Sequence, residues 1–129
     1  MARLILDSGA VIALAANQER ARAFVERALR EHVLLVIPAV VIAGTTRGGA
    51  REARVNRVLH AVHEITTVTE AVARAAGRLL AAAAISNATV DALIVAEAVL
   101  HGPSLILTGD VEDLSALAAN HPSVRVYGI

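Results

Sequence analysis

The residues best suited to chemistry in this chain are its aspartates, of which there are only four among 129 residues. Asp7, Asp91 and Asp110 stand where an apolar stretch ends or where a helix is expected to begin. In an open parallel α/β sheet, the carboxyl ends of strands and the amino ends of helices share one edge. A carboxylate next to buried strands is costly unless it is paired or bound to metal. The pattern therefore predicts a site for a hard divalent cation, Mg²⁺ or Mn²⁺.

The composition indicates a core of small and aliphatic side chains, because hydrophobic residues make up 56% of the chain and aromatic residues only 2%. A chain of this length is expected to form a single domain over residues 1–129. The absence of cysteine excludes disulfides and thiolate chemistry. No signal peptide is expected, and no apolar run reaches the roughly 18 residues that span a membrane. These features favour a cytoplasmic protein.

The charges are balanced, with 12 acidic residues against 12 basic residues that are all arginine. A net charge of zero argues against a protein that coats nucleic acid, although a local basic strip is compatible with a nuclease. Arg51, Arg54 and Arg57 recur at intervals of three, and Arg47 precedes them. Two interpretations remain open: a phosphate-binding track for RNA, or a solvated helix face partly paired with Glu52.

The elements that must position the aspartates alternate along the chain. Strands are expected at residues 3–7, 33–37, 62–68, 104–107 and 124–127, and helices at 10–16, 18–31, 38–46, 50–61, 70–84, 90–101 and 110–120. Ser8 and Gly9 are expected to turn the chain, while Asn17, Thr69 and Thr89 are the expected N-caps. Strands alternating with helices predict a parallel sheet covered on both faces.

Three short motifs occur in an order and in a strand–helix context typical of one family. They are Leu6-Asp7-Ser8, Thr89-Val90-Asp91-Ala92-Leu93 and Leu107-Thr108-Gly109-Asp110. With these motifs the chain resembles the PIN domain along nearly its whole length, and its compact size resembles the toxin nucleases of VapBC-type toxin–antitoxin systems. The resemblance implies a three-layer α/β/α fold with a central parallel five-stranded sheet.

The resemblance also implies a metal-dependent endoribonuclease that cleaves single-stranded RNA. In such an enzyme Mg²⁺ or Mn²⁺ lowers the pKa of a bound water and neutralises charge on the phosphate. Carried over by position, the direct or water-mediated ligands would be Asp7, Asp91 and Asp110. Asp113, one helical turn after Asp110, would be an outer ligand. Ser8 and Thr108 would be polar neighbours that orient the metal ligands.

Partners are expected on two grounds. The mean hydropathy of +0.59 and the alanine-rich helix expected at 70–84 predict an apolar surface that another chain covers. The resemblance implies a homodimer and an antitoxin whose tail covers the acidic site, with an Arg or Lys against the carboxylates.

The chain departs from the family pattern at Gly44, where a Glu is usual in the helix after the second strand. No other acid lies between Glu31 and Glu52, so a small shift in register does not supply one. Three interpretations stay open. Three aspartates suffice for weakened activity, the chain is a natural binding-only relative, or Gly44 replaces a Glu that was changed to remove toxicity. We expect impaired activity on a nuclease scaffold, with a silent PIN-fold protein that binds antitoxin or RNA as the alternative.

Other function classes fit the sequence less well. A receiver domain or aspartyl-phosphate enzyme needs a second acid two residues after Asp7 or a late lysine, but position 9 is glycine and lysine is absent. A dinucleotide-binding fold lacks its glycine fingerprint after the first strand. The histidines are expected at helix ends without a metal role, and Phe24 and Tyr127 are expected to serve packing.

Overall fold

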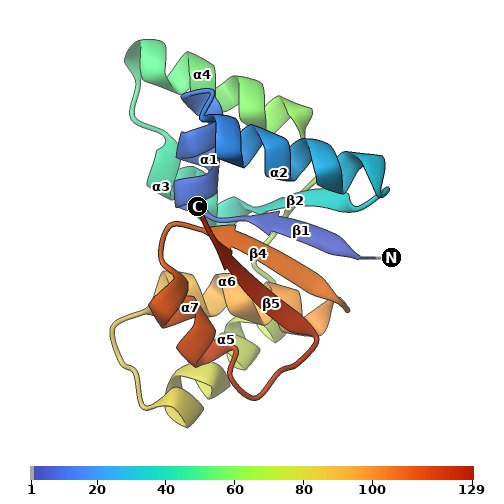
Figure 1. Cartoon of the computed structure of the whole chain (residues 1–129). Coiled ribbons are helices and arrows are strands. Elements are labelled where there is room, and N and C mark those ends of the chain that lie inside the picture. Colours follow the sequence, from blue (N-terminus) through green and yellow to red (C-terminus); the bar gives the residue numbers. More distant parts are fainter. Residues whose placement is uncertain (1) are drawn as a thin grey trace.

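The computed structural model describes residues 2–129, and five parallel strands form one sheet in that part of the chain (Figure 1). The strands are β1 (Arg3–Leu6), β2 (Leu34–Pro38), β3 (Glu64–Thr66), β4 (Ser104–Thr108) and β5 (Val124–Gly128). They lie in the order β3-β2-β1-β4-β5. The predicted central parallel five-stranded sheet is therefore confirmed.

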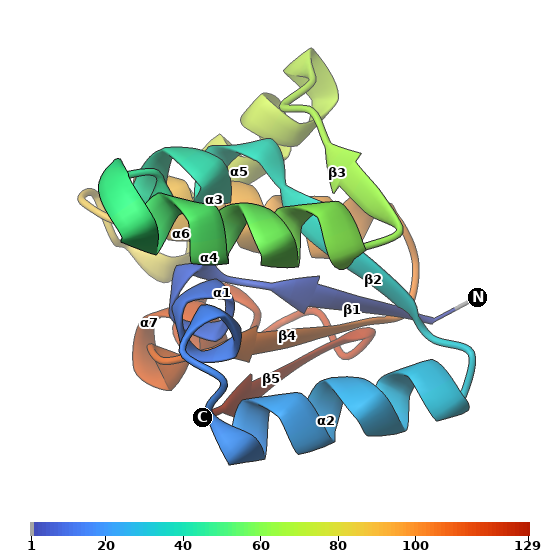
Figure 2. The same ribbon diagram turned by 90° about the horizontal axis from the view of Figure 1, so that it is seen from above.

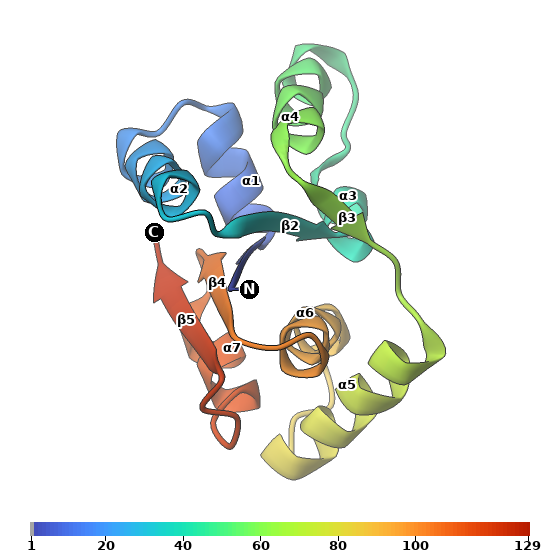
Figure 3. The same cartoon turned by 90° about the vertical axis from the view of Figure 1, so that its right-hand side faces the viewer.

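Helices cover both faces of this sheet, which confirms the predicted three-layer arrangement. On one side lie α1 (Ser8–Ala15), α2 (Glu19–Arg30) and α4 (Gly49–Ala61), with the short α3 (Ala39–Thr45) directly after β2 (Figure 1). On the other side lie α5 (Glu70–Ala83), α6 (Thr89–Leu100) and α7 (Val111–Leu117), as the view in Figure 3 shows. Within residues 2–129, none of the helices is both long and apolar enough to cross a membrane.

The core consists of small and aliphatic side chains, as the composition predicts. Strand β1 is buried along its whole length, and Leu4, Ile5 and Leu6 are fully inaccessible to solvent. A strand with helices on both faces has no solvated side, so its sequence is continuously apolar rather than alternating. The same reason explains the apolar run of β4, where Ile106 and Leu107 are also fully buried.

Two of the three expected N-caps are wrong. Asn17 has a left-handed backbone (φ 56°), a conformation that asparagine tolerates, and it lies in the turn between α1 and α2 rather than at the cap of α2. Thr89 is the first residue of α6, and Ala88 takes the cap position without a side-chain bond. The third is confirmed, because the Thr69 hydroxyl accepts a hydrogen bond from the Val72 amide at 3.2 Å.

Several boundaries also differ from the expected ones. Ser8 and Gly9 form no separate turn, because α1 begins at Ser8 directly after β1 with Asp7 as its N-cap. Strand β3 spans only three residues and lies at the edge of the sheet. It pairs with β2 from Glu64 onward, where Glu64 lies opposite Val36. Helix α7 ends at Leu117 and not at residue 120.

Candidate metal centre

The sheet topology brings the sequence-distant aspartates to one edge. Strands β1 and β4 are neighbours in parallel register, with Leu6 opposite Leu107, so both end at the same edge. Asp7 follows β1 directly, and Asp110 follows β4 by two residues. Figure 2 shows α1 and α7 at this end of the strands. The chain builds β2 and β3 on one side of β1 and β4 and β5 on the other, and such a reversal of strand order is where open α/β sheets bind ligands.

Three of the aspartates form a compact group. Asp91, Asp110 and Asp113 each offer a carboxylate oxygen, and these oxygens lie within 4.8 Å of one another. Asp91 comes from the first turn of α6 and Asp113 from the first turn of α7. Asp110 and Asp113 are exposed, so the group opens to solvent. Oxygen ligands at this spacing suit a hard divalent cation.

Asp7 lies beside that group but is buried and held by hydrogen bonds. Its Oδ1 accepts from the Ser8 amide at 2.6 Å, and its Oδ2 accepts from the Thr108 hydroxyl at 2.6 Å. The same hydroxyl oxygen accepts from the Asp110 amide at 2.9 Å. Thr108 is fully buried and thereby connects the end of β1 to the turn before α7. Each carboxylate oxygen has a second lone pair, so Asp7 retains acceptor capacity for a cation.

The electrostatics of the edge point to a missing positive charge. Burial, followed in order by the negative charges of Asp7, Asp110 and Asp113, raises the pKa of Asp91 to about 6. Among residues 2–129, no Arg or His side chain forms an ion pair with any of these four acids. A cation placed among the carboxylates would relieve this repulsion, so the donor set fits a divalent metal ion.

Gly44 borders the same edge. It lies in the last turn of α3, and a Cβ atom built on it would stand 3.0 Å from the Ser8 hydroxyl oxygen. Ser8 follows Asp7 directly, so a side chain at position 44 would start next to the acidic edge. The contact is tight, but the serine hydroxyl can rotate away, and a longer side chain is therefore compatible with the backbone here.

A close approach between two glycines was not anticipated. A Cβ atom on Gly9 would lie 2.9 Å from the backbone nitrogen of Gly109, so only glycine lets the first turn of α1 meet the turn after β4. Each glycine stands within two residues of a candidate ligand in the sequence, at Asp7 and Asp110 respectively. The position of each glycine next to a candidate ligand was the signal in the sequence for this close approach.

Arg47 lies in the turn before α4, and Arg51, Arg54 and Arg57 lie along α4. Two of these four arginines donate hydrogen bonds to carbonyl oxygens near helix ends. Arg47 donates to the carbonyl oxygens of Ala43 and Thr46, at 2.9 and 2.8 Å. Arg57 donates to the Ala15 carbonyl at 3.2 Å, at the end of α1. Arg51 and Arg54 are exposed and border a small hollow between α1 and α4. In the described part of the chain Glu52 forms no ion pair, so the expected pairing within α4 is absent.

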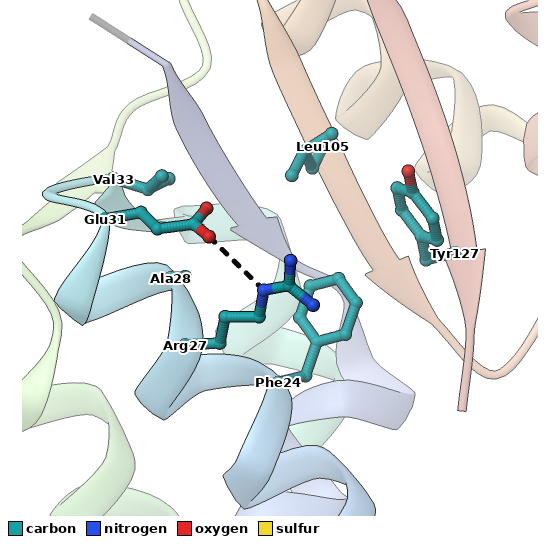
Figure 4. Close-up of a pocket in the computed structure, with 7 residues that line it drawn as sticks. All are labelled: Phe24, Arg27, Ala28, Glu31, Val33, Leu105 and Tyr127. Atoms are coloured by element: carbon teal, nitrogen blue, oxygen red, sulfur yellow. Dashed lines mark hydrogen bonds and ion pairs between the residues drawn. The ribbon is translucent and has the colours of Figure 1, made fainter.

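The aromatic residues Phe24 and Tyr127 pack against each other. The ring centroids of Phe24 and Tyr127 lie 5.5 Å apart, which confirms their expected packing role. Figure 4 shows both rings at a cavity of about 290 Å³ between α2 and the strands β4 and β5. Its further lining residues are Arg27, Ala28, Glu31, Val33 and Leu105.

The PIN domain profile matches residues 4–120, and the chain therefore belongs to the PIN-domain family. Members of this family are generally nucleases. No match to this chain was found among curated protein sequences.

Solved structures with the same fold come from toxin–antitoxin complexes. VapBC2 of Rickettsia felis, bound to a DNA fragment from its promoter, has a TM-score of 0.76 at 13% identity, over 100% of this chain and 99% of that one. A toxin–antitoxin complex of Klebsiella pneumoniae has a TM-score of 0.70 at 21% identity, over 98% and 99%. VapBC-5 of Mycobacterium tuberculosis has a TM-score of 0.61 at 22% identity, over 99% and 98%. These similarities extend over nearly the whole of each chain and establish the fold.

Proposed function

We propose that this chain is a VapC-type toxin, a Mg²⁺- or Mn²⁺-dependent endoribonuclease whose activity is reduced by Gly44. The observation that carries the proposal is the gathering of four aspartates at one sheet edge with no cation from the described chain to balance them. Membership of a nuclease family and a fold shared with toxin–antitoxin complexes support it.

The arrangement of the four aspartates supports the proposed ligand set. Asp91, Asp110 and Asp113 would hold the ion, and Asp7 would contact it directly or through water. The bound ion supplies an activated water and neutralises charge on the scissile phosphate. Thr108 keeps the Asp7 carboxylate and the turn before α7 in fixed relation, because its hydroxyl group bonds to both. Ser8 supports Asp7 through its amide.

Single-stranded RNA is the proposed substrate, held mainly through its phosphates. Arg51 and Arg54 are the candidates for these contacts, because they are exposed and belong to none of the ion pairs found in residues 2–129. Arg47 is less suited than expected, since its guanidinium already bonds to two carbonyl oxygens at the end of α3. Guanidinium groups bind phosphate oxygens in a bidentate way, which compensates for the scarcity of aromatic residues.

An antitoxin and a second copy of the chain are the proposed partners, and the cytoplasm is the proposed place of action. The structures with a similar fold are complexes with antitoxins, which supports the first of these partners. The alternative function is a PIN-fold protein that binds antitoxin or RNA without cleavage. Gly44 favours it, because position 44 lies beside Ser8 and brings no carboxylate to the acidic edge.

The test compares RNA cleavage by the chain and by its Gly44→Glu variant, each in Mg²⁺ and in Mn²⁺. We expect the variant to cleave roughly 10–100-fold faster or more, the range typical for restoring a group that supports a metal site. The double variant Gly44→Glu/Asp7→Ala controls for a contaminating nuclease and should lose the gained activity.

The outcomes separate the two functions. Cleavage by the Gly44→Glu variant alone would mean that this chain is a disabled nuclease. Equal cleavage by both proteins would show that the aspartates suffice. If a pool of random single-stranded RNA is left intact by both, the binding function replaces the enzymatic one.

A further inference from the structure

A second group of charged side chains lies buried away from the acidic edge. Arg3 of β1 and Glu97 of α6 are only 7% and 3% exposed. Ionisable side chains of these types are almost never this buried without a partner. The two residues are 94 positions apart in the chain, so only the fold brings them together.

Arg3 and Glu97 form the centre of a small ion cluster. The Arg3 Nη2 atom lies 3.9 Å from the Glu97 Oε1 atom and 3.2 Å from the Glu64 Oε1 atom of β3. The Glu97 Oε2 atom lies 2.5 Å from the Nδ1 atom of His101, which is half exposed. Arg3 Nη1 and Glu97 Oε2 have no hydrogen-bond partner among the described residues, so the ion pairs of Arg3 with Glu64 and Glu97 and the contact of Glu97 with His101 balance these charges.

Among residues 2–129, helix α6 has few polar contacts to other elements that could fix its position along the sheet. It is buried nearly all round, between the sheet and α5, and several of its buried side chains are alanine. Small side chains give shallow ridges, and such a surface resists sliding less well than interlocking larger side chains. The Ser104 hydroxyl reaches the Ala98 carbonyl only at 3.5 Å. A buried ion pair is most favourable when its two charges stay close, so the Arg3–Glu97 contact favours one register of α6 on the sheet.

We propose that the Arg3–Glu97 pair fixes α6 against β1 and thereby sets the position of Asp91 relative to Asp7. Both are positioning residues, because they act through the elements that carry the acids and touch neither substrate nor ion. Glu97 lies six residues after Asp91, about 9 Å along the helix axis. Arg3 lies four residues before Asp7, about 13 Å along the strand. The pair thus ties the far ends of the two elements whose near ends carry carboxylates.

The effect on metal binding rests on the proposed function, whereas the effect on α6 does not. The experiment therefore measures both, using Arg3→Met, Glu97→Met and the double variant. Single variants leave one buried charge with only a more exposed partner, Glu64 for Arg3 or His101 for Glu97, and should lower Tm by roughly 10 °C or more. The double variant replaces the pair with apolar side chains of similar volume and should regain most of that loss.

The decisive measurement is amide hydrogen exchange over residues 89–95, in EDTA, for the double variant and the parent chain. We expect exchange there to be about tenfold faster in the double variant despite its similar Tm, because the helix has lost its register. We also expect Mn²⁺ affinity, measured by titration without RNA, to fall about tenfold. The double variant Arg27→Met/Glu31→Met removes an exposed ion pair from α2 and should change neither quantity.

Unchanged exchange over residues 89–95 together with unchanged Mn²⁺ affinity would overturn the proposal, and so would single variants as stable as the parent. If the Met double variant does not fold, Arg3→Gln/Glu97→Gln removes the same charges with less change of shape and carries the same expectations. A parent chain that binds no Mn²⁺ would refute the proposed function, while the exchange rates would still decide whether the pair positions α6.

Discussion

The two groups of carboxylates in this molecule differ in what balances their charge. Glu97 and Glu64 lie beside the Arg3 guanidinium, and His101 stands next to Glu97. At the carboxyl edge of the sheet, four aspartates gather with no ion pair from residues 2–129. The first group has its positive charges within the chain, whereas the second has none among the described residues.

Burial alone does not separate the two groups. Asp7 is 7% exposed and Glu97 is 3% exposed, so both carboxylates have lost most of their water. Asp7 is held by neutral donors, an amide and a hydroxyl group, while Glu97 faces charged partners. A buried charge with charged partners serves the fold, and a cluster of like charges costs folding free energy that bound metal can return. Neutralising an acid should therefore lower the folding stability in the first group and raise it in the second.

The largest expected effect is the loss of stability in Glu97→Gln. The substitution removes the buried carboxylate that lies beside Arg3 and leaves Arg3 only the more exposed Glu64 as a partner. We expect a loss of about 3 kcal/mol in the free energy of unfolding, measured by urea denaturation. Glu31→Gln is the matched control, because that side chain is exposed and its pair with Arg27 should contribute less than about 0.5 kcal/mol. Equal losses of stability in the two variants would mean that the buried and the exposed carboxylate contribute alike to folding.

Metal binding should stabilise the acidic edge by a slightly smaller amount. At a free Mn²⁺ concentration of 100 times Kd, the chain should gain about 2.7 kcal/mol relative to EDTA. Gly44→Glu should lower Tm in EDTA and increase the Mn²⁺-induced rise, because it adds a carboxylate beside Ser8. Thermal denaturation of both proteins, with NaCl at equal ionic strength as the control, measures this. An identical metal response in the two proteins would show that position 44 does not contribute to the site.

Thr108→Val tests why Asp7 is tolerated without a charged partner. The substitution removes the hydroxyl group that donates to Asp7 and accepts from the Asp110 amide, so we expect a loss of about 1–2 kcal/mol. Thr45→Val is a matched control, since that buried hydroxyl only donates to carbonyls of its own helix. Calorimetry should show a smaller loss for the control. A Thr108→Val protein as stable as the parent would mean that Asp7 is held by other means.

The smallest expected effect has the opposite sign. Asp91→Asn should stabilise the metal-free protein at pH 7.5 by about 1 kcal/mol, after allowance for solvent around this partly exposed group. The pKa of Asp91 is raised from 3.8 to about 6, so the unfolded chain loses this proton first as pH rises. Stability of the parent should thus fall between about pH 4 and pH 6 and change no further above that range on this account.

Glu112 provides the matched control for Asp91. Glu112→Gln removes an exposed acid from the first turn of α7 that lies outside the compact group, and it should leave the pH profile unchanged. Tm measured in EDTA from pH 4 to pH 8 gives the profile. If Asp91→Asn follows the parent at every pH, the aspartates do not repel one another as the geometry indicates.

Much of the fold could be predicted because its signals are local. Runs such as Arg3–Leu6 and Ser104–Thr108 are apolar over one strand length, and Thr69 precedes a helix in the usual capping position. The caps at Asn17 and Thr89 were predicted wrongly, because a capping residue type also suits a left-handed turn or a first helical turn. Glu97 carries a local signal as well, because it is the one charged residue of α6 beyond the first turn of that otherwise apolar helix.

The sequence by itself determined the alternation of strands and helices, the aliphatic core and the placement of aspartates after strands or in the first turn of a helix, since each depends on neighbouring residues. The tertiary structure alone decided which acids are closest. It grouped Asp113 with Asp91 and Asp110, and it buried Asp7 behind Thr108. It also decided that Arg3 meets Glu97. These contacts join residues far apart in the chain, and their distances depend on strand order and helix packing, which no local pattern encodes.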